Sequence, residues 1–213
     1  MDKNKALARG RPRSEASREA IIAAASELLR TVGLNRMSIE AVAEASGVGK
    51  TTIYRWWPSK GTLALDAYLE DMRAKVVVPD TGDGWEDFRR HARAVIDFYA
   101  GPEGRIFAQF MAEAQNDPIL AEVFRERFLA QRRTAVKTMW TRGVVRGEFR
   151  ADVDADVAMD MMFAPIVYRL LAGHAPLSRP LAERLVDAAM GGLAANPSSS
   201  RLPKKRTPDL QKP

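Results

Sequence analysis

The sequence predicts an all-α protein with a small N-terminal three-helix domain and a larger helical domain. Apolar residues recur every three or four positions through almost the whole chain, and glycines and prolines separate these periodic segments. The one β-rich run, VVVPDTGDG, is interrupted by Pro79 and two glycines and is expected to be a loop. We therefore expect a flexible basic arm, a small helical domain, a larger helical domain and a disordered basic tail at residues 1–13, 14–60, 61–195 and 196–213, respectively.

Composition excludes several classes of protein. Of the 213 residues 46% are apolar, which suits a globular core, and no run of about 18 apolar residues could cross a membrane. The N-terminus lacks the apolar core of a secretory signal, so we expect a cytoplasmic protein. Without cysteine there are no disulfides or zinc fingers. His91 and His174 have no second histidine three or four residues away, so neither a metal site nor a cofactor is expected.

Charge is distributed unevenly along the chain. Residues 1–60 carry 11 Lys/Arg and 6 Asp/Glu, residues 61–195 carry 17 and 20, and residues 196–213 carry 5 and 1. The partial charges of +5, −3 and +4 give the formal +6 of the whole chain. A local excess of cations is what neutralisation of nucleic-acid phosphates requires. The arm at 1–13 is then either a DNA-binding extension or a solubilising tail.

Residues 38–60 have the pattern of a helix-turn-helix. Ser38 is a good N-cap for a short amphipathic helix, and Gly47 and Gly49 interrupt that helix before a second one begins near Lys50. Burying Ile53 and one tryptophan against the first helix leaves a polar face outward. Cations, hydroxyls and a phenol on such a face can bind phosphates and base edges in a major groove.

The predicted DNA-binding residues divide by role. Lys50, Thr51, Thr52 and Arg55 are assigned to base or phosphate contacts, and Ser38, Tyr54 and Lys60 to positioning on the backbone. Lys60 is expected in the first turn of a helix, where a cation opposes the helix dipole, so an anion is expected nearby. Trp56 is assigned either to DNA contact or to packing.

A phosphate-binding P-loop is a competing interpretation of Gly49-Lys50-Thr51. That motif needs a glycine five positions before Gly49, where this chain has Glu44, and it needs a buried strand upstream. The P-loop is therefore rejected.

Residues 18–65 resemble the DNA-binding domain of the TetR family of bacterial transcriptional regulators. The resemblance rests on REAIIAAASELLRTVGLNRMSIEAVAEASGVGKTTIYRWWPSKGTLAL, and Trp56-Trp57 departs from the histidine or tyrosine and phenylalanine that the family usually has there. It implies a homodimer that binds a palindromic operator on double-stranded DNA, acts most often as a repressor, and binds a small-molecule effector in its second domain. An activator would have the same sequence pattern.

The larger domain reads as helix throughout. Apolar stripes and turn residues predict helices over residues 59–76, 85–100, 103–115, 118–146, 155–171 and 179–194.

Two sites are expected in this domain. Methionines and aromatic residues are dense enough to form a largely apolar ligand pocket, although each of them at helical spacing is more often core. Two polar residues interrupt the apolar stripe of 118–146, so the proposed lining is Phe107, Met111, Gln131, Thr138 and Met139. The helix 155–171 is apolar nearly all round and must be buried on every side. A four-helix dimer interface is therefore expected, with Met161, Met162, Ile166, Leu185 and Ala189.

A small-molecule carrier or enzyme with a vestigial DNA-binding head is the alternative. It would need a nucleophile with its base, or paired carboxylates, in the larger domain. The candidates are Asp97, Glu113 and Asp160, and nothing in the sequence gives them partners, so no catalytic residues are assigned.

Overall fold

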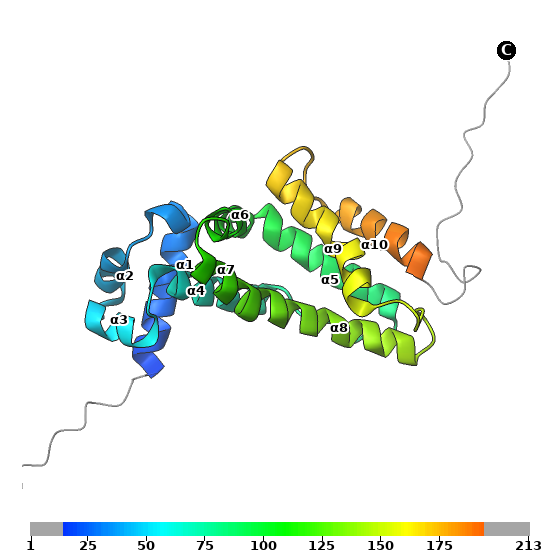
Figure 1. The fold of residues 1–213 in the computed structure, drawn as a ribbon, viewed down its shortest axis with the longest axis horizontal. Helices are drawn as coiled ribbons and strands as arrows, with labels where there is room; N and C mark the ends of the chain where they lie inside the picture. Colours follow the sequence, from blue (N-terminus) through cyan, green and yellow to red (C-terminus); the bar gives the residue numbers. More distant parts are fainter. Residues whose placement is uncertain (1–14, 194–213) are drawn as a thin grey trace, which may run out of the picture. The chain divides into compact units, whose positions relative to one another are not determined.

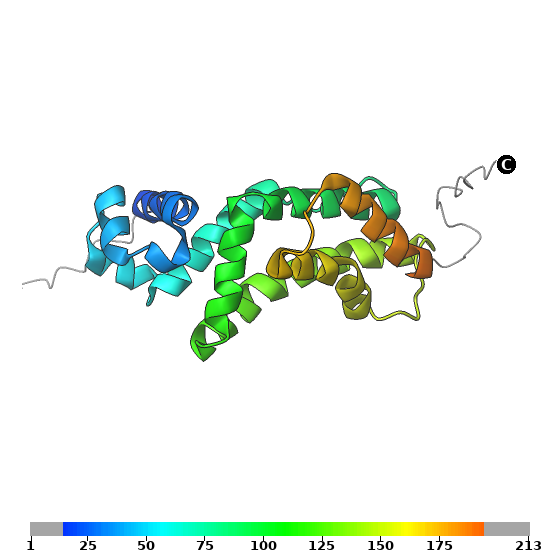
Figure 2. The same cartoon turned by 90° about the horizontal axis from the view of Figure 1, so that it is seen from above.

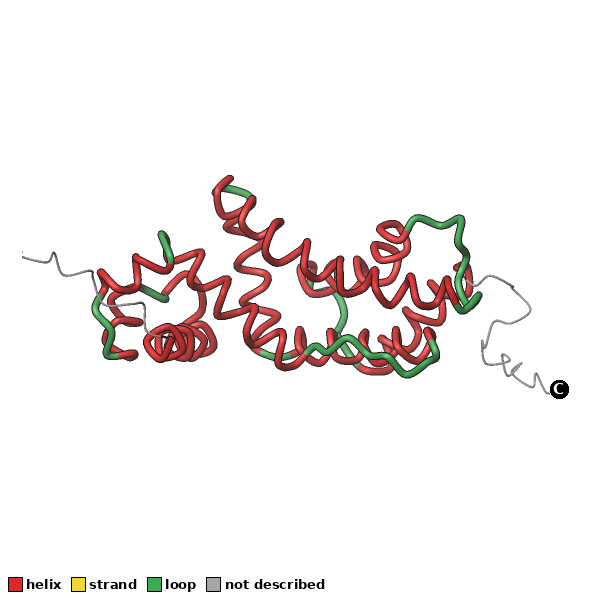
Figure 3. The backbone as a smooth tube through the Cα atoms, turned by 90° about the horizontal axis from the view of Figure 1, so that it is seen from below, coloured by secondary structure: helices red, strands yellow, loops and turns green. Residues whose placement is uncertain are grey.

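Helices and connecting loops make up the protein in the computed structural model, which describes residues 15–193 (Figure 3). The chain folds as two compact units that divide between Leu69 and Glu70. The sequence-based division lay at 60/61. Among the described residues, no helix is long and apolar enough to span a bilayer.

The first unit contains helices α1 (Glu15–Arg36), α2 (Ile39–Ser46) and α3 (Lys50–Trp56). Gly33, with φ 80° and ψ 171°, breaks the helical conformation inside α1. Ser38 caps α2, because its hydroxyl oxygen accepts a hydrogen bond from the Ala41 N–H at 3.1 Å. Gly47 ends α2 in the left-handed conformation with φ 67°. Helix α3 begins at Lys50, where the second helix of the helix-turn-helix was predicted to begin.

Helix α4 (Lys60–Lys75) begins in the first unit and continues into the second. Its first half is held there by two hydrogen bonds. The Trp57 indole N–H donates to Asp66 at 2.8 Å, and the Ser26 hydroxyl donates to the Ala67 carbonyl at 3.4 Å. These contacts explain why the first unit extends nine residues beyond the predicted boundary. The core beneath them contains Ile21, Ala25, Leu29, Leu34, Val42, Ile53, Trp57, Leu63 and Ala64.

The second unit is a bundle of helices around α5. Helices α5, α8 and α9 pack together, and α10 lies against α5 and α9 (Figure 1). Helix α6 runs across the direction of α5 (Figure 2). The elements are α5 (Gly84–Ala100), α6 (Pro102–Ala114), α7 (Pro118–Val123), the π-helical segment η1 (Phe124–Leu129), α8 (Ala130–Val145), α9 (Ala155–Ala172) and α10 (Arg179–Leu193).

Aspartates start three of these helices. The carboxylates of Asp83, Asp117 and Asp154 each accept hydrogen bonds from two backbone N–H groups in the first turns of α5, α7 and α9. A carboxylate here satisfies unpaired donors and also lies at the positive end of the helix dipole. The acidic run 152–156 was expected to open a helix, and Asp154 does so.

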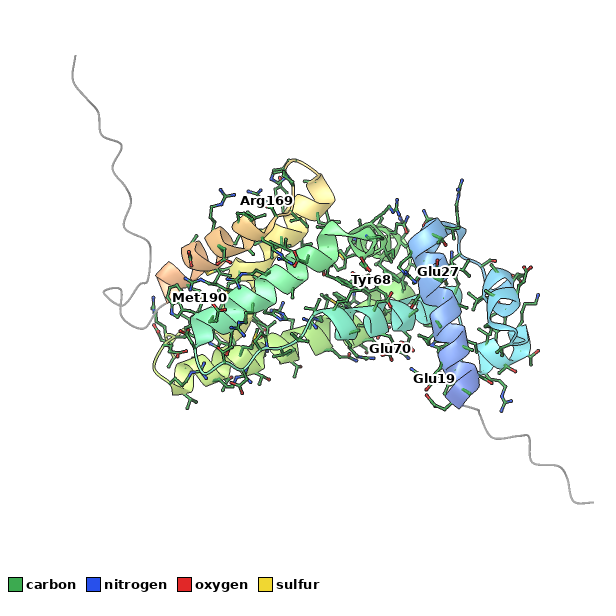
Figure 4. The ribbon with its side chains drawn as sticks, turned by 180° about the vertical axis from the view of Figure 1, so that it is seen from behind. Glu19, Glu27, Tyr68, Glu70, Arg169 and Met190 are labelled. Atoms are coloured by element: carbon green, nitrogen blue, oxygen red, sulfur yellow. The ribbon has the colours of Figure 1, made fainter. Side chains whose placement is uncertain are left out.

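A ladder of ion pairs joins α5 to α10. Arg89 bonds Asp187 at 2.6 Å, Arg93 bonds Glu183, and Asp97 bonds Arg179 at 2.8 Å. The α5 members are four residues apart and therefore share one helix face. Met190, labelled in Figure 4, is buried on α10. The ladder fixes which face of α10 packs on α5.

One helix was predicted over residues 118–146, and the structure forms three segments there. Helices α7 and α8 are continuous through η1, where the backbone has π-helical hydrogen bonding. A π segment accommodates one additional residue and changes the direction in which every later side chain points. This difference decides which residues of α8 face the interior.

Candidate DNA-binding helix and ligand cavity

Helix α3 exposes a polar face and buries one residue. Ile53 is fully buried against the first unit, whereas Lys50, Thr51, Tyr54 and Arg55 are exposed and Thr52 is half-buried. The exposed set supplies two cations, a hydroxyl and a phenol on one short helix. This face can donate hydrogen bonds to phosphate oxygens and to base edges.

The two tryptophans after Arg55 have different environments. Trp57 is 2% exposed and is the tryptophan that packs in the core, where it bonds Asp66. Trp56 is half-buried, with its ring centroid 6.0 Å from that of Trp57. Trp57 therefore fixes the end of α3 on α4, and Trp56 lies between this core and the surface.

Lys50 already has an acidic neighbour in this structure. Its ammonium is 3.1 Å from a carboxylate oxygen of Glu40 on α2, and both side chains are exposed. The backbone N–H of Glu40 and then Lys50 hold the pKa of this carboxyl below its ordinary value. A phosphate that approaches Lys50 must compete with Glu40, so the pair weakens the attraction of this end of α3 for anions.

Lys60 and Ser38 also have internal partners. The Lys60 ammonium donates to the Leu34 carbonyl at 3.0 Å, in the last turn of α1, where the helix dipole favours a cation. This contact accounts for a cation in the first turn of α4 without a bound anion. The Ser38 hydroxyl accepts the capping bond of α2, and its side chain is half-buried.

A cavity of about 410 Å³ lies inside the second unit. Its wall is formed mainly by three stripes, one each from α5, η1–α8 and α9. Phe107 of α6 and Met72 of α4 complete it. The α5 stripe is His91, Val95 and Tyr99. The η1–α8 stripe is Phe128, Leu129, Arg132, Arg133 and Val136. The α9 stripe is Met159, Asp160, Phe163, Ala164, Val167, Tyr168 and Leu171. Its volume is in the range of small-molecule sites.

Of the five predicted pocket residues, the cavity wall includes Phe107. Met139 is fully buried outside the cavity and Met111 is half-buried. Gln131 is exposed and accepts a hydrogen bond from Arg73 at 3.1 Å. Thr138 is also exposed, and its hydroxyl donates to the Thr134 carbonyl at 3.0 Å.

The additional residue in η1 explains these positions. Counting an uninterrupted α-helix from Leu120 turns Gln131, Ala135 and Thr138 inward. The π segment replaces each by the residue that follows it, so Arg132, Val136 and Met139 point inward. Sequence reasoning therefore missed Arg132, and it also missed His91 because it assigned the histidine no partner.

His91 connects three parts of the second unit. Its Nδ1 is 2.8 Å from the carbonyl oxygen of Val77, which can only accept, so Nδ1 carries the proton. Its Nε2 then accepts a hydrogen bond from Arg132 at 3.1 Å. Burial and then the Arg132 charge lower the pKa of His91 to about 4, so this imidazole is neutral at pH 7. Burial also raises the pKa of the Tyr99 phenol, which keeps its proton.

The other charged groups of the wall form a network of their own. Arg133 bonds Asp156 and Asp160, both at 2.9 Å, and Lys137 bonds Asp156 at 2.7 Å. In this network the positive charges of Arg133 and Lys137 are balanced by the negative charges of Asp156 and Asp160. The acids considered as catalytic candidates have similarly ordinary positions: Asp97 pairs with Arg179 and Asp160 with Arg133, while Glu113 is half-buried. Among residues 15–193 no three His, Asp or Glu side chains are grouped to hold a metal ion.

The residues predicted for a dimer interface divide into buried and accessible ones. Met162, Ile166 and Ala189 are buried in the core of the second unit. Leu185 is half-buried, and Met161 is 49% exposed. Helix α9 thus packs one apolar face internally and leaves a second set of apolar residues exposed, Val157, Met161, Ala164, Tyr168 and Leu171, the last three of which also border the cavity.

The first unit is a helix-turn-helix head, and the second is a helical domain with a cavity, which together are typical of ligand-responsive transcriptional regulators. The family model for bacterial regulatory proteins of the tetR family matches residues 21–67, and the model for tetracyclin repressor-like C-terminal domains matches residues 78–189. The chain belongs to the TetR family. It is a DNA-binding transcriptional regulator with an all-α fold.

Relatives match along nearly the whole chain. The uncharacterized HTH-type transcriptional regulator YdeS of Bacillus subtilis is 34% identical over 91% of this chain and 98% of its own length. The DNA-binding transcriptional repressor TetR of Mycobacteroides abscessus is 30% identical over 85% of this chain and 93% of its own length. The crystal structure of the TetR family transcription regulator SCO0332 has 36% identity and a TM-score of 0.77 and covers 84% of this chain and 99% of that one.

Replacing His91 by a non-titrating residue should change how stability depends on pH. The pKa of His91 in the folded chain, about 4, is below the ordinary 6.5, so the unfolded chain binds more protons between these values. The free energy of unfolding should therefore fall by up to about 1.4 kcal/mol per pH unit as the pH falls from 6.5 to 4. His91→Gln, which keeps a donor and an acceptor, should lose this component. Urea unfolding at several pH values checks it, and parallel pH profiles for the two proteins would contradict it.

Proposed function

We propose that this regulator is a homodimeric repressor that binds a palindromic operator in the cytoplasm and is released from it by a small molecule. The observation that carries the proposal is the outward polar face of α3 in a TetR-family head, together with a cavity in the second unit of the same chain. Each subunit would insert α3 into one major groove, with the two heads one helical turn or a multiple of it apart, about 34–36 Å per turn.

The proposed DNA contacts follow the exposure of each side chain. Lys50, Thr51, Thr52 and Arg55 contact bases or phosphates, and Tyr54, 51% exposed, positions the backbone. Ser38, Lys60 and the half-buried Trp56 lie at the margins of this surface. For Lys60 the bond to Leu34 supports a structural role beside a phosphate contact.

The proposed dimer forms through α9 and α10. The exposed face of α9 carries apolar side chains at every third or fourth position over four turns, which is the pattern of a helix that packs against a partner. Ala188 and Gly192 are exposed on α10 and are small enough to allow close helix approach. We therefore retain Met161 and Leu185 as interface residues and assign Met162 and Ile166 to the subunit core.

Helix α4 offers a physical route from ligand to DNA. It contains Asp66, which bonds Trp57 at the end of α3, and Met72, which lines the cavity. A ligand that contacts Met72 can favour one position of this continuous helix. Release from DNA then requires that the ligand bind one dimer geometry more tightly than the other.

The carrier or enzyme alternative has no observation in its favour: of its candidate acids, Asp97 and Asp160 are in ion pairs, and Glu113 is half-buried on α6 with no nucleophile or second carboxylate placed beside it by any described contact. Turnover without DNA affinity would support it.

Selection of DNA from a random pool by the purified protein at near-physiological salt tests the function directly. We expect a recovered palindrome whose half-site spacing reports the distance between the two heads. Sequencing the bound fraction checks this. A pool without enrichment, both with and without cell-extract small molecules, would contradict sequence-specific repression.

Lys60→Ala should weaken binding to every DNA sequence alike and reduce the slope of log affinity against log salt by about one, because one phosphate contact is lost. Lys60→Arg, which keeps the charge, is the matched control and should retain the slope. Fluorescence anisotropy over a salt series measures both. An unchanged slope with reduced thermal stability would instead assign Lys60 to the bond with Leu34 alone.

Met161→Asp should dissociate the dimer, because it places an unpaired carboxylate in an apolar interface. We expect the dimer dissociation constant to rise by about 100-fold or more. Val145→Asp is the control, since Val145 is an apolar residue of α8 that is 82% exposed. Sedimentation equilibrium measures both, and equal dimer affinities for the two variants would place the interface elsewhere.

A further inference from the structure

An ion pair lies where the start of α2 meets the start of α3, beside the face proposed to contact DNA. The Lys50 ammonium on α3 is 3.1 Å from a carboxylate oxygen of Glu40 on α2, and more than half of each side chain is exposed. The N-terminal residues of a recognition helix contact base edges in the major groove. A group that bonds Lys50 at about 3 Å would lie within about 6 Å of that Glu40 oxygen. Glu40 is therefore placed beside whatever Lys50 binds.

Glu40 carries its negative charge at the N-terminal end of α2. It lies in the first turn of this helix, where the helix dipole favours a carboxylate. Its own backbone N–H and then Lys50 keep the pKa of the carboxyl below its ordinary value, so it is ionised at pH 7. In the same turn the Ser38 hydroxyl accepts the Ala41 N–H at 3.1 Å. A DNA phosphate that approaches this helix end meets a negative charge.

For DNA of arbitrary sequence this carboxylate is unfavourable. Sequence-independent binding comes almost entirely from cations that neutralise phosphates. A phosphate that bonds Lys50 must take the place of Glu40, and the displaced carboxylate then lies near a second anion, which repels it. Glu40 thus lowers the affinity for DNA that offers this end of α3 only phosphates.

A G·C base pair can satisfy both members of the ion pair. In the major groove guanine presents the acceptors O6 and N7, which lysine can bond, and cytosine presents the N4 amino donor, which a carboxylate can accept. Guanine O6 and cytosine N4 are hydrogen bonded to each other, so they are about 2.9 Å apart. This spacing is close to the 3.1 Å between the Lys50 nitrogen and the Glu40 oxygen. The charges of the ion pair and of the base-pair edge are therefore complementary.

Resting on the proposed contact of α3 with the operator, we propose that Glu40 determines sequence specificity together with Lys50. Lys50 donates to guanine and Glu40 accepts from cytosine in one G·C pair of each operator half-site. On DNA without this pair the Glu40 carboxylate has no amino group to accept from and opposes binding.

Selection from a random DNA pool with full-length variants tests the base contact. The wild type should recover a palindrome with G·C at one position of each half-site. Glu40→Ala should lose the preference at this position, and Glu40→Gln should favour adenine in place of that cytosine, because glutamine bonds adenine N6 and N7. Glu27→Gln is the matched control and should keep the wild-type sequence, since it removes the same charge and an ion pair, with Arg30, from α1. The wild-type sequence recovered by Glu40→Ala would overturn the proposal.

Affinity for unrelated DNA tests the competition at Lys50. Glu40→Gln should bind an unrelated duplex about 5-fold more tightly than the wild type does, the upper range for one exposed charge pair. Its ratio of operator to unrelated affinity should fall, whereas Glu27→Gln should keep the wild-type ratio. Fluorescence anisotropy at fixed salt measures both duplexes on the same folded protein, so a change in stability leaves the ratio interpretable. Equal ratios for Glu40→Gln and the wild type would overturn the proposed discrimination.

The outcomes separate this proposal from the proposed function. A wild-type pool without an enriched sequence would contradict both. A palindrome recovered equally by the wild type and by both Glu40 variants would leave operator binding standing and overturn only the role of Glu40.

Discussion

The second unit depends on two hydrogen bonds made by a single buried imidazole. His91 is on α5, the Val77 carbonyl it binds belongs to the loop after α4, and the guanidinium it accepts from belongs to α8. A neutral ring can donate at one nitrogen and accept at the other, whereas a charged ring would direct a proton at Arg132. The neutral state of His91 thus allows one ring to bond both neighbouring segments. The cavity forms around the same contact.

Different interactions hold the two sides of the bundle. On the α10 side, charged pairs with α5 accompany buried apolar residues of α10 such as Leu181, Val186 and Met190. On the α9 side, Met159, Met162 and Ile166 pack inward, and the opposite face of the same helix is apolar and uncovered. A partner subunit on that face would stabilise α9, which also supplies much of the cavity wall. Dimer formation and ligand binding would then both involve α9.

Much of the first unit could be predicted from the sequence, because its signals are local. Gly33 and Gly47 require backbone conformations that other residues rarely adopt, Ser38 caps its own helix, and Lys50–Trp56 has one buried residue and a polar remainder. The choice between Trp56 and Trp57 could not be predicted, because it depends on Asp66 in the following helix. The partner of Lys60 was missed for the same reason, since Leu34 is 26 residues away.

The cavity was harder to predict, because the spacing of apolar residues identifies the inward face of a helix only while the number of residues per turn stays constant. Phe107 was placed correctly in the wall from its own short helix. Gln131 and Thr138 were assigned to the wall because they interrupt an apolar stripe that was taken as one α-helix through Phe124–Leu129. Each lies one residue before an inward position, Arg132 and Met139, which corresponds to a rotation of about 100°. His91 gave no local signal, because both its partners are distant in sequence.

The π-helical segment has a consequence for the comparison of relatives. A homologue whose corresponding helix is α-helical throughout would have one residue fewer in the segment that joins α7 to α8. A correct alignment with it needs a gap of one residue inside Phe124–Leu129. Without that gap, Gln131 and Ala135 would be matched to the homologue's cavity residues, and the cation that borders this cavity would be paired with a surface position. The cavity residues of such relatives can be compared, and a shared type of effector inferred, only after this one-residue offset in the alignment has been corrected.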